Sequence, residues 1–337
     1  MTRRSTQVEG APAMPLVGVA AGGRGGLAAS SVRLAERVQG QIEEAGIGAV
    51  VLHEGASLAE ALAQGRLTVL QDVTYGRYGR LEAVAASAGL PFLGTGARQA
   101  EVYDKVRLKT ALLAGGASTP RHQVLDFHNL ADAWPLIDLF DGPVVVKPAT
   151  ADLLSEGVRW FPAADPADAE LRRHVERLFL TDQIVLLEEL VAGTEVCAGF
   201  RSSDDGLEMF PVLTVVKDEV LFDHEVKTHQ RYRFAPVTLS GRVLREIERV
   251  GRLLAAEFHV SGYWYVNAMV TADERVSVFD AGTTVGLGDK SYFPAAARLA
   301  GLTVRQLVHH QFVEPVLSLL QREHGSSMPS VQREAAR

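Results

Sequence analysis

The stretch IVLLEELVAGTE, residues 184–195, is where the prediction of the fold begins. It consists of a short apolar strand that ends in Glu188, followed by a polar turn that leads to Glu195. A buried strand that passes through a carboxylate into a polar turn is common at hinges. Taken alone, Glu188 is equally compatible with a structural role and with ligand binding.

Upstream of this stretch, the sequence predicts a small α+β domain in which helices and strands alternate. The elements are expected, in chain order, at residues 105–113 (helix), 123–125 (strand), 130–140 (helix), 143–147 (strand), 167–179 (helix) and 184–188 (strand). The helix at 130–140 is expected in spite of Pro135.

The first third of the chain alternates short apolar strands with helices. The strands are expected at residues 15–20, 49–52, 67–70 and 90–93, and the helices between them at 32–45, 57–63 and 81–88. Apolar strands separated by helices predict a parallel sheet covered by helices. Ligands of such sheets bind beyond the carboxyl ends of the strands.

The last third predicts antiparallel strands joined by polar turns. Strands are expected at residues 195–200, 209–216, 219–222, 262–270 and 276–280, with a long helix at 241–258 and a closing helix at 303–320. His224 and His229 are placed in a loop, and His309 and His310 in the closing helix. Neither spacing resembles a zinc site.

Composition limits the classes of partner. The chain has 337 residues, of which 47% are hydrophobic and 22% charged, and its net charge is −7. This balance is typical of a folded globular protein and too apolar for a disordered one. The negative charge argues against nucleic acid or anionic lipid as partner, so a bound anion must meet a local cluster of cations. No apolar run approaches the roughly 18–20 residues that cross a bilayer, which argues against an integral membrane protein.

Cys197 is the only cysteine, so no intramolecular disulfide can form and a reducing cytoplasm is expected. It lies in the apolar run VCAGF, which favours a small buried residue over a reactive thiol. Residues 1–14 and 323–337 are polar and are interpreted as a disordered leader and tail. The leader lacks the apolar stretch of a signal peptide.

Three lysines stand where a charge needs compensation. Lys105 follows Asp104 at a helix start, Lys147 ends a run of three valines, and Lys227 lies in DHEVK. A lysine at a strand end loses hydration unless an anion compensates its charge. Each lysine alone is explained more simply by an ammonium group that reaches solvent.

A glycine-rich turn, GGRGG at residues 22–26, follows the first strand and precedes a helix. This context suits close approach of the backbone to an anion, but the turn lacks the dinucleotide-binding spacing. A plain strand-to-helix turn is an equally good interpretation.

Taken together, these segments resemble the ATP-grasp ligases, most closely the D-alanine–D-alanine ligase branch, over roughly residues 15–320. The matching motifs, in the order of the family, are PFLGTG (91–96), DKVRLK (104–109), VKPA (146–149), LEELVAGTE (187–195) and SYFP (291–294). Each motif alone is weak evidence, whereas five in the correct order and at near-family spacing are specific.

The resemblance implies the ATP-grasp fold, which combines α/β and α+β parts. A Rossmann-like N-terminal domain at residues 15–99 would precede a central domain at 100–188 and a C-terminal domain at 189–322, and the last two would clasp ATP. The implied chemistry is phosphorylation of a carboxylate by ATP, followed by attack of an amine on the acyl phosphate to give an amide or peptide bond. Cations and Mg²⁺ hold the phosphoryl charge in such reactions.

The resemblance also implies roles for individual residues. The nucleotide positions are Lys105 and Lys147 for the ATP phosphates, Glu188 for the adenine amino group, the Val191 backbone for the adenine ring, Glu195 for the ribose hydroxyls and Lys227 for the phosphoryl end. The phosphate-covering loop corresponds to residues 150–157, which keep Ser155 but gain acids and leucines.

The metal site departs from the family pattern. The family's aspartate, glutamate and asparagine ligands correspond to Asn267, Asp280 and Gly282. One formal charge and one side chain are therefore lost, and a charge pair at about 4 Å is worth on the order of 4 kcal/mol near a protein surface. Asp280 and Asn267 are thus expected to hold Mg²⁺, and the number of bound ions can be as low as one. The family's arginine, which stabilises the tetrahedral intermediate, corresponds to Tyr265, which brings no fixed charge.

The substrate side departs as well. The family's glutamate for the ammonium group of the first amino acid corresponds to Leu27, and its histidine falls near Asp72. Candidate substrate residues are Ser31, Tyr75, Ser291 and Tyr292, and candidate catalytic residues are Lys227, Tyr265 and Ser291. We therefore expect an amino-acid-like carboxylate and an amine as substrates, in specialised metabolism rather than peptidoglycan synthesis.

Two alternatives stay open. Asn267, Gly282 and Tyr265 are also compatible with a protein that binds nucleotide without ligation. An ATP-grasp enzyme of another outcome, such as phosphotransfer or intramolecular ring closure, is the second alternative. Relatives of this branch are commonly dimers, so a homodimer is expected.

Overall fold

The computed structural model describes residues 14–23, 26–75, 79–150, 155–203, 206–288 and 290–324. Residues 1–13 of the predicted leader, 325–337 of the predicted tail, 151–154 and Gly76 lie outside these ranges. Internal contacts divide the chain into two units. The first comprises the residues up to Gly96 together with those from Val308 onward, and the second comprises Ala97–Leu307.

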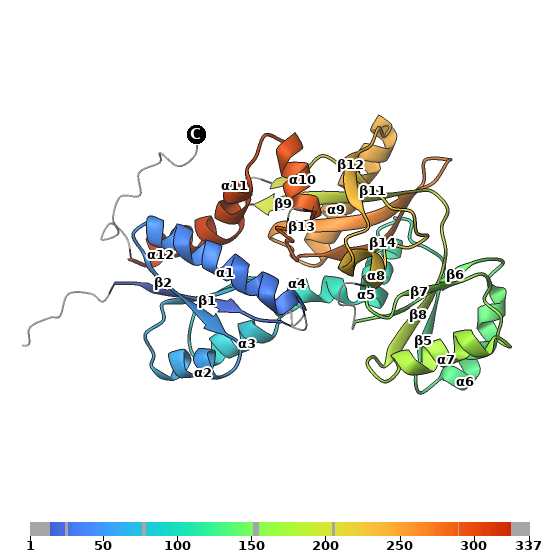
Figure 1. Cartoon of the computed structure of the whole chain (residues 1–337), viewed down its shortest axis with the longest axis horizontal. Helices are drawn as coiled ribbons and strands as arrows, with labels where there is room; N and C mark the ends of the chain where they lie inside the picture. Colours follow the sequence, from blue (N-terminus) through green and yellow to red (C-terminus); the bar gives the residue numbers. More distant parts are fainter. Residues whose placement is uncertain are drawn as a thin grey trace, which may run out of the picture. The chain divides into compact units, whose positions relative to one another are not determined.

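A four-stranded parallel sheet forms the centre of the first unit, as the alternation of strands and helices predicts. Its strand order is β2 (Gly48–His53), β1 (Leu16–Ala21), β3 (Val69–Asp72) and β4 (Phe92–Leu93). The helices that follow β1, β2 and β3 are α1 (Gly26–Glu44), α2 (Ala56–Ala63) and α3 (Arg80–Ser87). In Figure 1, α1 lies on one side of the sheet, and α2 and α3 lie on the other.

The end of the chain belongs to the first unit from Val308 onward. The single helix predicted at 303–320 is instead three segments: α11 (Val304–Val308), a π-helical segment (His309–Val313) and α12 (Glu314–His324). The π-helical segment packs against α1. The domain limits predicted at 15–99, 100–188 and 189–322 stay predictions.

The second unit begins with α4 (Ala97–Ala100), a 3₁₀ turn (Glu101–Tyr103) and α5 (Lys105–Ala114). An antiparallel sheet follows, with the order β5 (His122–Asp126), β8 (Ile184–Glu189), β6 (Val144–Pro148) and β7 (Arg159–Phe161). The helix α7 (Ala169–Leu178) packs on β6, and α6 (Leu130–Ala133) packs on β5. The helix predicted at 130–140 is wrong beyond Ala133, where a 3₁₀ segment (Trp134–Leu139) takes over, because Pro135 lacks an amide hydrogen for the α-helical ladder.

The second sheet of this unit is also antiparallel. Its order is β12 (Arg233–Pro236), β11 (Leu213–Val216), β9 (Thr194–Ser203), β13 (Gly262–Val270) and β14 (Val276–Gly282), and β10 (Gly206–Met209) pairs with β9. The long helix α9 (Gly241–Glu257) packs on β9, β10 and β14, and α10 (Tyr292–Leu299) packs on β9 and β12. Phe200 and Trp264 stack in the core with their ring centroids 4.7 Å apart.

Three local predictions in this region are wrong. The strand predicted at 209–216 is interrupted between β10 and β11, where Pro211 cannot donate to a ladder. Residues 219–221 form bends and Phe222 has no regular structure, so no strand forms here. Leu221 and Phe222 line a cavity instead. His224 does not lie in a loop but begins α8 (His224–Thr228), a short helix that Asp223 caps by accepting a hydrogen bond from the Val226 amide.

Within the described part of the chain, no helix combines the length and the apolar character that a membrane span requires.

Candidate active site

A cavity of about 480 Å³ lies in the second unit and is lined by residues of both sheets. The four-stranded sheet contributes Lys147 from β6 and Glu188 from β8, and the six-stranded sheet contributes Asn267 from β13 and Asp280 from β14. The last residue of β8 and the segment after it, residues 189–193, form another part of the wall. The stretch from which the fold prediction starts therefore borders this cavity.

Three lysines from three different elements line the cavity. Lys105 is the first residue of α5, whose start is fixed because the Asp104 carboxylate accepts hydrogen bonds from the Val106 and Arg107 amides. Lys147 lies in β6, and Lys227 lies in α8. The structure thus brings together the three ammonium groups that the sequence singled out.

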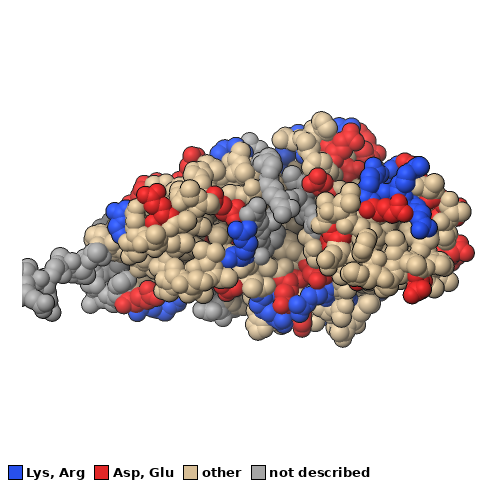
Figure 2. Space-filling model, turned by 90° about the horizontal axis from the view of Figure 1, so that it is seen from below, with Lys and Arg blue, Asp and Glu red and all other residues tan. Residues whose placement is uncertain are grey.

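The three lysines lie together at one cavity. On the face shown in Figure 2, the acidic and basic side chains of the described residues are interspersed. On this face, the overall negative charge of the protein is not relieved by a broad positive patch.

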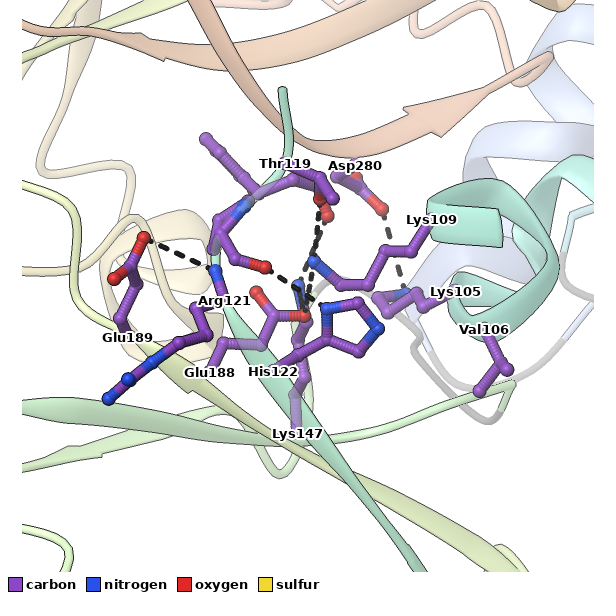
Figure 3. Close-up of polar contacts among 12 residues, drawn as sticks. Lys105, Val106, Lys109, Thr119, Arg121, His122, Lys147, Glu188, Glu189 and Asp280 are labelled. Atoms are coloured by element: carbon purple, nitrogen blue, oxygen red, sulfur yellow. Dashed lines mark hydrogen bonds and ion pairs between the residues drawn. The ribbon is translucent and has the colours of Figure 1, made fainter. Parts of the chain in front are cut away.

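Glu188 is the centre of a buried ion cluster (Figure 3). Its Oε1 lies 2.9 Å from the Lys147 Nζ and 3.1 Å from the Lys109 Nζ, and all three side chains are almost completely buried. Lys109 also donates a hydrogen bond to the Thr119 hydroxyl, at 2.9 Å, and Lys147 donates one to the Phe279 carbonyl, at 3.1 Å. One carboxylate therefore compensates two ammonium groups.

The cluster shifts the proton affinity of its members. Burial alone would raise the pKa of Glu188, but the charges of Lys147 and Lys109 outweigh burial and lower that pKa below its usual value. Burial lowers the pKa of Lys109 to about 8, although Glu188 opposes the shift. Burial, and then the charge of Lys109, also lower the pKa of His122. Glu188 is therefore ionised at neutral pH, whereas Lys109 holds its proton less tightly than an ordinary lysine.

The segment that follows Glu188 carries two further predicted positions. Val191 and Glu195 both line the cavity. The Glu195 Oε2 lies 2.5 Å from the Lys217 Nζ, in a pair of which each side chain is about one-tenth exposed. This contact holds the Glu195 carboxylate in one orientation at the cavity wall.

Lys227 and Ser155 meet at another part of the wall. The Lys227 Nζ donates a hydrogen bond to the Ser155 hydroxyl at 2.5 Å and lies 4.8 Å from the centre of the Phe222 ring. Ser155 belongs to the predicted phosphate-covering loop, of which residues 151–154 lie outside the described ranges. Both residues line the same cavity as Lys105 and Lys147.

Asp280 and Asn267 form the acidic and amide part of the cavity. They face each other across the β13–β14 pair, with the Asn267 Nδ2 3.5 Å from the Asp280 Oδ2. The Asp280 Oδ1 lies 3.6 Å from the Lys105 Nζ. Carboxylate and amide oxygens are ligands that Mg²⁺ accepts, so this pair fits the metal that the resemblance implies. The described residues contain no group of three or more His, Cys, Asp or Glu side chains arranged for a metal, so further ligands would be water or ligand oxygens.

The space next to Gly282 is filled by two tyrosines. A methyl group added to Gly282 would lie 2.8 Å from the Tyr265 hydroxyl and 2.9 Å from the Tyr103 ring. The Tyr103 hydroxyl is itself held at 2.8 Å by the Thr283 amide. The side chain that a third metal ligand would need at this position is therefore excluded by neighbouring residues.

The two candidates in the SYFP motif have different surroundings. The Tyr292 hydroxyl accepts a hydrogen bond from the Gly199 amide at 2.6 Å and donates one to the Pro211 carbonyl at 3.0 Å, and the ring is buried. These bonds give Tyr292 a packing role between α10 and the sheet. Ser291 directly precedes α10, and its hydroxyl lies close to Gly286 and Gly288.

Ser31 and Tyr75 belong to the first unit and not to the one that holds the cavity. The Ser31 hydroxyl is buried, accepts a hydrogen bond from the Gly22 amide at 3.0 Å and donates one to the Val73 carbonyl at 2.7 Å. Tyr75 pairs with Gly23 through a parallel bridge. Both residues therefore stabilise the chain at the carboxyl ends of β1 and β3. Their substrate-binding roles stay predictions.

Cys197 is buried, as the favoured interpretation expected. Burial, followed by the charges of Glu195 and Asp280, raises the pKa of its thiol well above the usual value. The residue is therefore unreactive as a thiolate at neutral pH.

Two lysines without a predicted role, Lys109 and Lys217, pair with Glu188 and Glu195. Lys109 stands four residues after Lys105 in the motif DKVRLK, a spacing that places both on one face of a helix. That spacing could have identified Lys109. The contact between Lys217 and Glu195 joins residues 22 positions apart and depends on the pairing of β9 with β11. No local sequence pattern therefore predicts this contact.

Comparison with known proteins gives consistent results. A family model described as "D-ala D-ala ligase C-terminus" matches residues 135–313, more than half of the chain. A D-alanine–D-alanine ligase of Cupriavidus necator is 27% identical over 91% of this chain and 94% of the relative. One from Bordetella petrii is 26% identical over 88% and 91%.

Solved structures share the fold. D-alanine–D-alanine ligase from Bacillus anthracis, in complex with ATP, superposes with a TM-score of 0.71 and 19% identity over 92% of this chain and 100% of that one. VanG D-Ala:D-Ser ligase from Enterococcus faecalis gives 0.72 and 18% over 88% and 98%.

The fold and the family match define the class: this protein is an ATP-grasp enzyme, an ATP-dependent carbon–nitrogen ligase. The predicted fold class is thereby confirmed. Within that class, the chain belongs to the D-alanine–D-alanine ligase family.

Proposed function

We propose that this enzyme uses ATP and Mg²⁺ to join an amino-acid-like carboxylate to an amine, and that ATP binds in the cavity of the second unit. The observation that carries the proposal is the convergence of Lys105, Lys147 and Lys227 on one cavity that also holds Glu188 and Asp280. Ammonium groups from three elements form a positive site in an overall negative protein, which is the arrangement that a triphosphate requires.

The nucleotide would lie along the wall formed by β8 and the segment after it. Glu188 would accept a hydrogen bond from the adenine amino group, the Val191 backbone would donate to the ring, and Glu195, oriented by Lys217, would accept from the ribose hydroxyls. Lys105 and Lys147 would contact the phosphates. Lys227, together with Ser155, would contact the phosphoryl group that is transferred. These positions order the cavity from an adenine end to a phosphate end.

Asp280 and Asn267 would hold Mg²⁺ at the phosphate end. When bound, the metal supplies positive charge that neutralises the phosphate oxygens. Because Tyr265 and Tyr103 fill the space beside Gly282, we propose a single ion.

A substrate carboxylate oxygen would attack the terminal phosphorus of ATP and release ADP. The amine nitrogen would then attack the carbonyl carbon of the acyl phosphate, lose a proton and expel inorganic phosphate. The phenol of Tyr265 lies on the same strand as Asn267 and would donate one hydrogen bond to the oxyanion of the tetrahedral intermediate. The Ser291 hydroxyl would contact a substrate carboxylate. We further propose substrate-binding roles for Ser31, Tyr75 and Tyr292.

We propose that the preferred substrate pair differs from two D-alanines, because Leu27 and Asp72 replace the side chains that the resemblance implies for the first amino acid. Specialised metabolism in the cytoplasm is the proposed context. Self-association as a homodimer is a further proposal, and light scattering on the purified protein tests it.

The test is ADP release from ATP and Mg²⁺ in the presence of D-amino acids, L-amino acids and hydroxy acids, supplied singly and in pairs. Release that depends on a carboxylate and an amine, together with a condensed product by mass spectrometry, supports the proposal. Nucleotide binding without release would favour a binding protein. Release with phosphate retained on the product, or with water lost from one substrate, would indicate phosphotransfer or ring closure.

A further inference from the structure

Lys109 belongs to the ion cluster of the cavity but stands behind its wall. Its side chain is 0% exposed, and it is not among the described residues that line the cavity. Its ammonium group contacts Glu188 and the Thr119 hydroxyl (Figure 3). A bound ligand would therefore not touch Lys109 directly.

We infer that Lys109 is a positioning residue that acts through Glu188 and sets the net charge that the cavity presents to a polyanionic ligand. Glu188 carries one negative charge and contacts two ammonium groups through the same oxygen, Oε1. When Lys109 is protonated, its charge balances Glu188, and the charge of Lys147 remains for the ligand. When Lys109 is neutral, Glu188 balances Lys147 instead, and the floor of the cavity loses one positive charge.

The charged and titratable groups that face Lys109 come from four elements. They are Glu188 on β8, Lys147 on β6, Lys105 one turn earlier on α5, and His122 on β5. Burial first, and then the like charges of Lys147 and Lys105, weaken the hold on the proton against the opposing charge of Glu188, in agreement with a pKa of about 8 for Lys109. Because the pKa of His122 is itself lowered, its ring stays neutral where Lys109 titrates.

A bound anion stabilises the protonated form of Lys109 and so raises its pKa. By linkage, the affinity for the anion is highest at a pH below the pKa of Lys109 in the ligand-free protein. The affinity falls as the pH rises through that pKa. The inference rests on the proposed function, because it requires the nucleotide to bind in this cavity.

The test is calorimetric titration with ATP, and separately with adenosine, between about pH 6.5 and about pH 9.5. For the unmodified protein we expect ATP affinity to weaken roughly tenfold from about pH 7 to about pH 9.5, while adenosine affinity stays constant. Lys109→Met should bind ATP roughly tenfold more weakly at about pH 7, with no further pH dependence. The matched control, Lys290→Met, removes a lysine that contacts the Gln230 carbonyl outside the cluster and should follow the unmodified protein.

A double variant shows whether weaker binding by Lys109→Met comes from the lost charge or from misfolding. Lys109→Met combined with Glu188→Gln removes both charges and should bind inorganic tripolyphosphate roughly tenfold more tightly than Lys109→Met alone. A purely structural role of Lys109 would weaken ATP and adenosine binding in parallel, and that result would overturn the inference.

Different results would refute the role of Lys109 and the proposed nucleotide site. ATP affinity that is independent of pH and unchanged in Lys109→Met, but lost in Lys147→Met, would refute only the role of Lys109. ATP affinity that is absent, or unchanged in Lys147→Met, would refute the nucleotide site itself.

Discussion

Replacement of Glu188 by glutamine should destabilise the second unit more than any single surface change. The substitution keeps the shape of the side chain but leaves two buried ammonium groups without a counter-charge, at atoms that now lie 2.9 Å and 3.1 Å from Oε1. Removal of one partner from a buried ion pair costs about 3–5 kcal/mol. For a unit of this size, that corresponds to a fall in Tm of about 6–20 °C.

The loss should depend on pH in a defined direction. In Glu188→Gln, burial without a counter-charge depresses the pKa of Lys109 in the folded state further below the unfolded value of about 10.4. The unfolded chain then binds more protons than the folded one, so stability rises with pH. The deficit relative to the unmodified protein should therefore be largest near about pH 6–7 and shrink toward about pH 9.

Thermal and urea unfolding followed by circular dichroism measure this effect. The matched control is Glu189→Gln, since the neighbouring Glu189 is half-buried and its carboxylate accepts a hydrogen bond from the Arg121 amide, at 3.2 Å, rather than compensating a buried charge. We expect it to lie within about 0.5 kcal/mol of the unmodified protein. A Glu188→Gln variant within about 1 kcal/mol of the unmodified protein at neutral pH would refute the argument that this carboxylate holds the cluster together.

Three further predictions concern other parts of the site. Asp280→Asn should abolish Mg²⁺-dependent ADP release in a coupled assay while Mg²⁺-free ATP binding persists by calorimetry; full turnover would mean that the metal binds elsewhere. Gly282→Ala should lower the free energy of unfolding by about 1–3 kcal/mol, because its methyl group meets the Tyr265 hydroxyl, and Tyr265→Phe should restore part of the loss; an unchanged Tm in the single variant would contradict this packing. Tyr292→Phe leaves the buried Gly199 amide without its acceptor and should cost about 1–3 kcal/mol in urea unfolding with ATP affinity unchanged; a selective loss of ATP affinity would contradict a packing role.

The sequence predicts those parts of the fold whose determinants are local. Alternating apolar segments predict the parallel sheet of the first unit because each strand must bury both faces against helices. The position of Lys105 at a helix start is predictable as well, since Asp104 is a strong capping residue. The strand predicted at residues 219–222 is wrong because the surroundings of these residues in the fold, and not their local sequence, decide their structure. Its apolar side chains face a cavity, and an apolar run does not reveal whether it packs against a sheet or lines a ligand site.

The candidate site was predictable where a charged side chain at the end of a strand or helix requires a counter-charge. A carboxylate at a strand end and lysines at strand and helix ends all require counter-charges, and the structure brings them together. Which groups pair could not be predicted. Glu188 on β8 contacts Lys109 on α5, which is far away in the sequence. The filling of the space beside Gly282 by Tyr265 likewise depends on the register of β13 against β14.

The central claim is that Lys105, Lys147 and Lys227 hold a triphosphate in one cavity. A crystal structure of this protein with a non-hydrolysable ATP analogue and Mg²⁺ tests it most directly. We expect the triphosphate inside the cavity, with phosphate oxygens at hydrogen-bond distance, about 2.7–3.2 Å, from all three Nζ atoms and the metal beside Asp280. A nucleotide bound elsewhere, or a triphosphate that none of the three ammonium groups contacts, would contradict it.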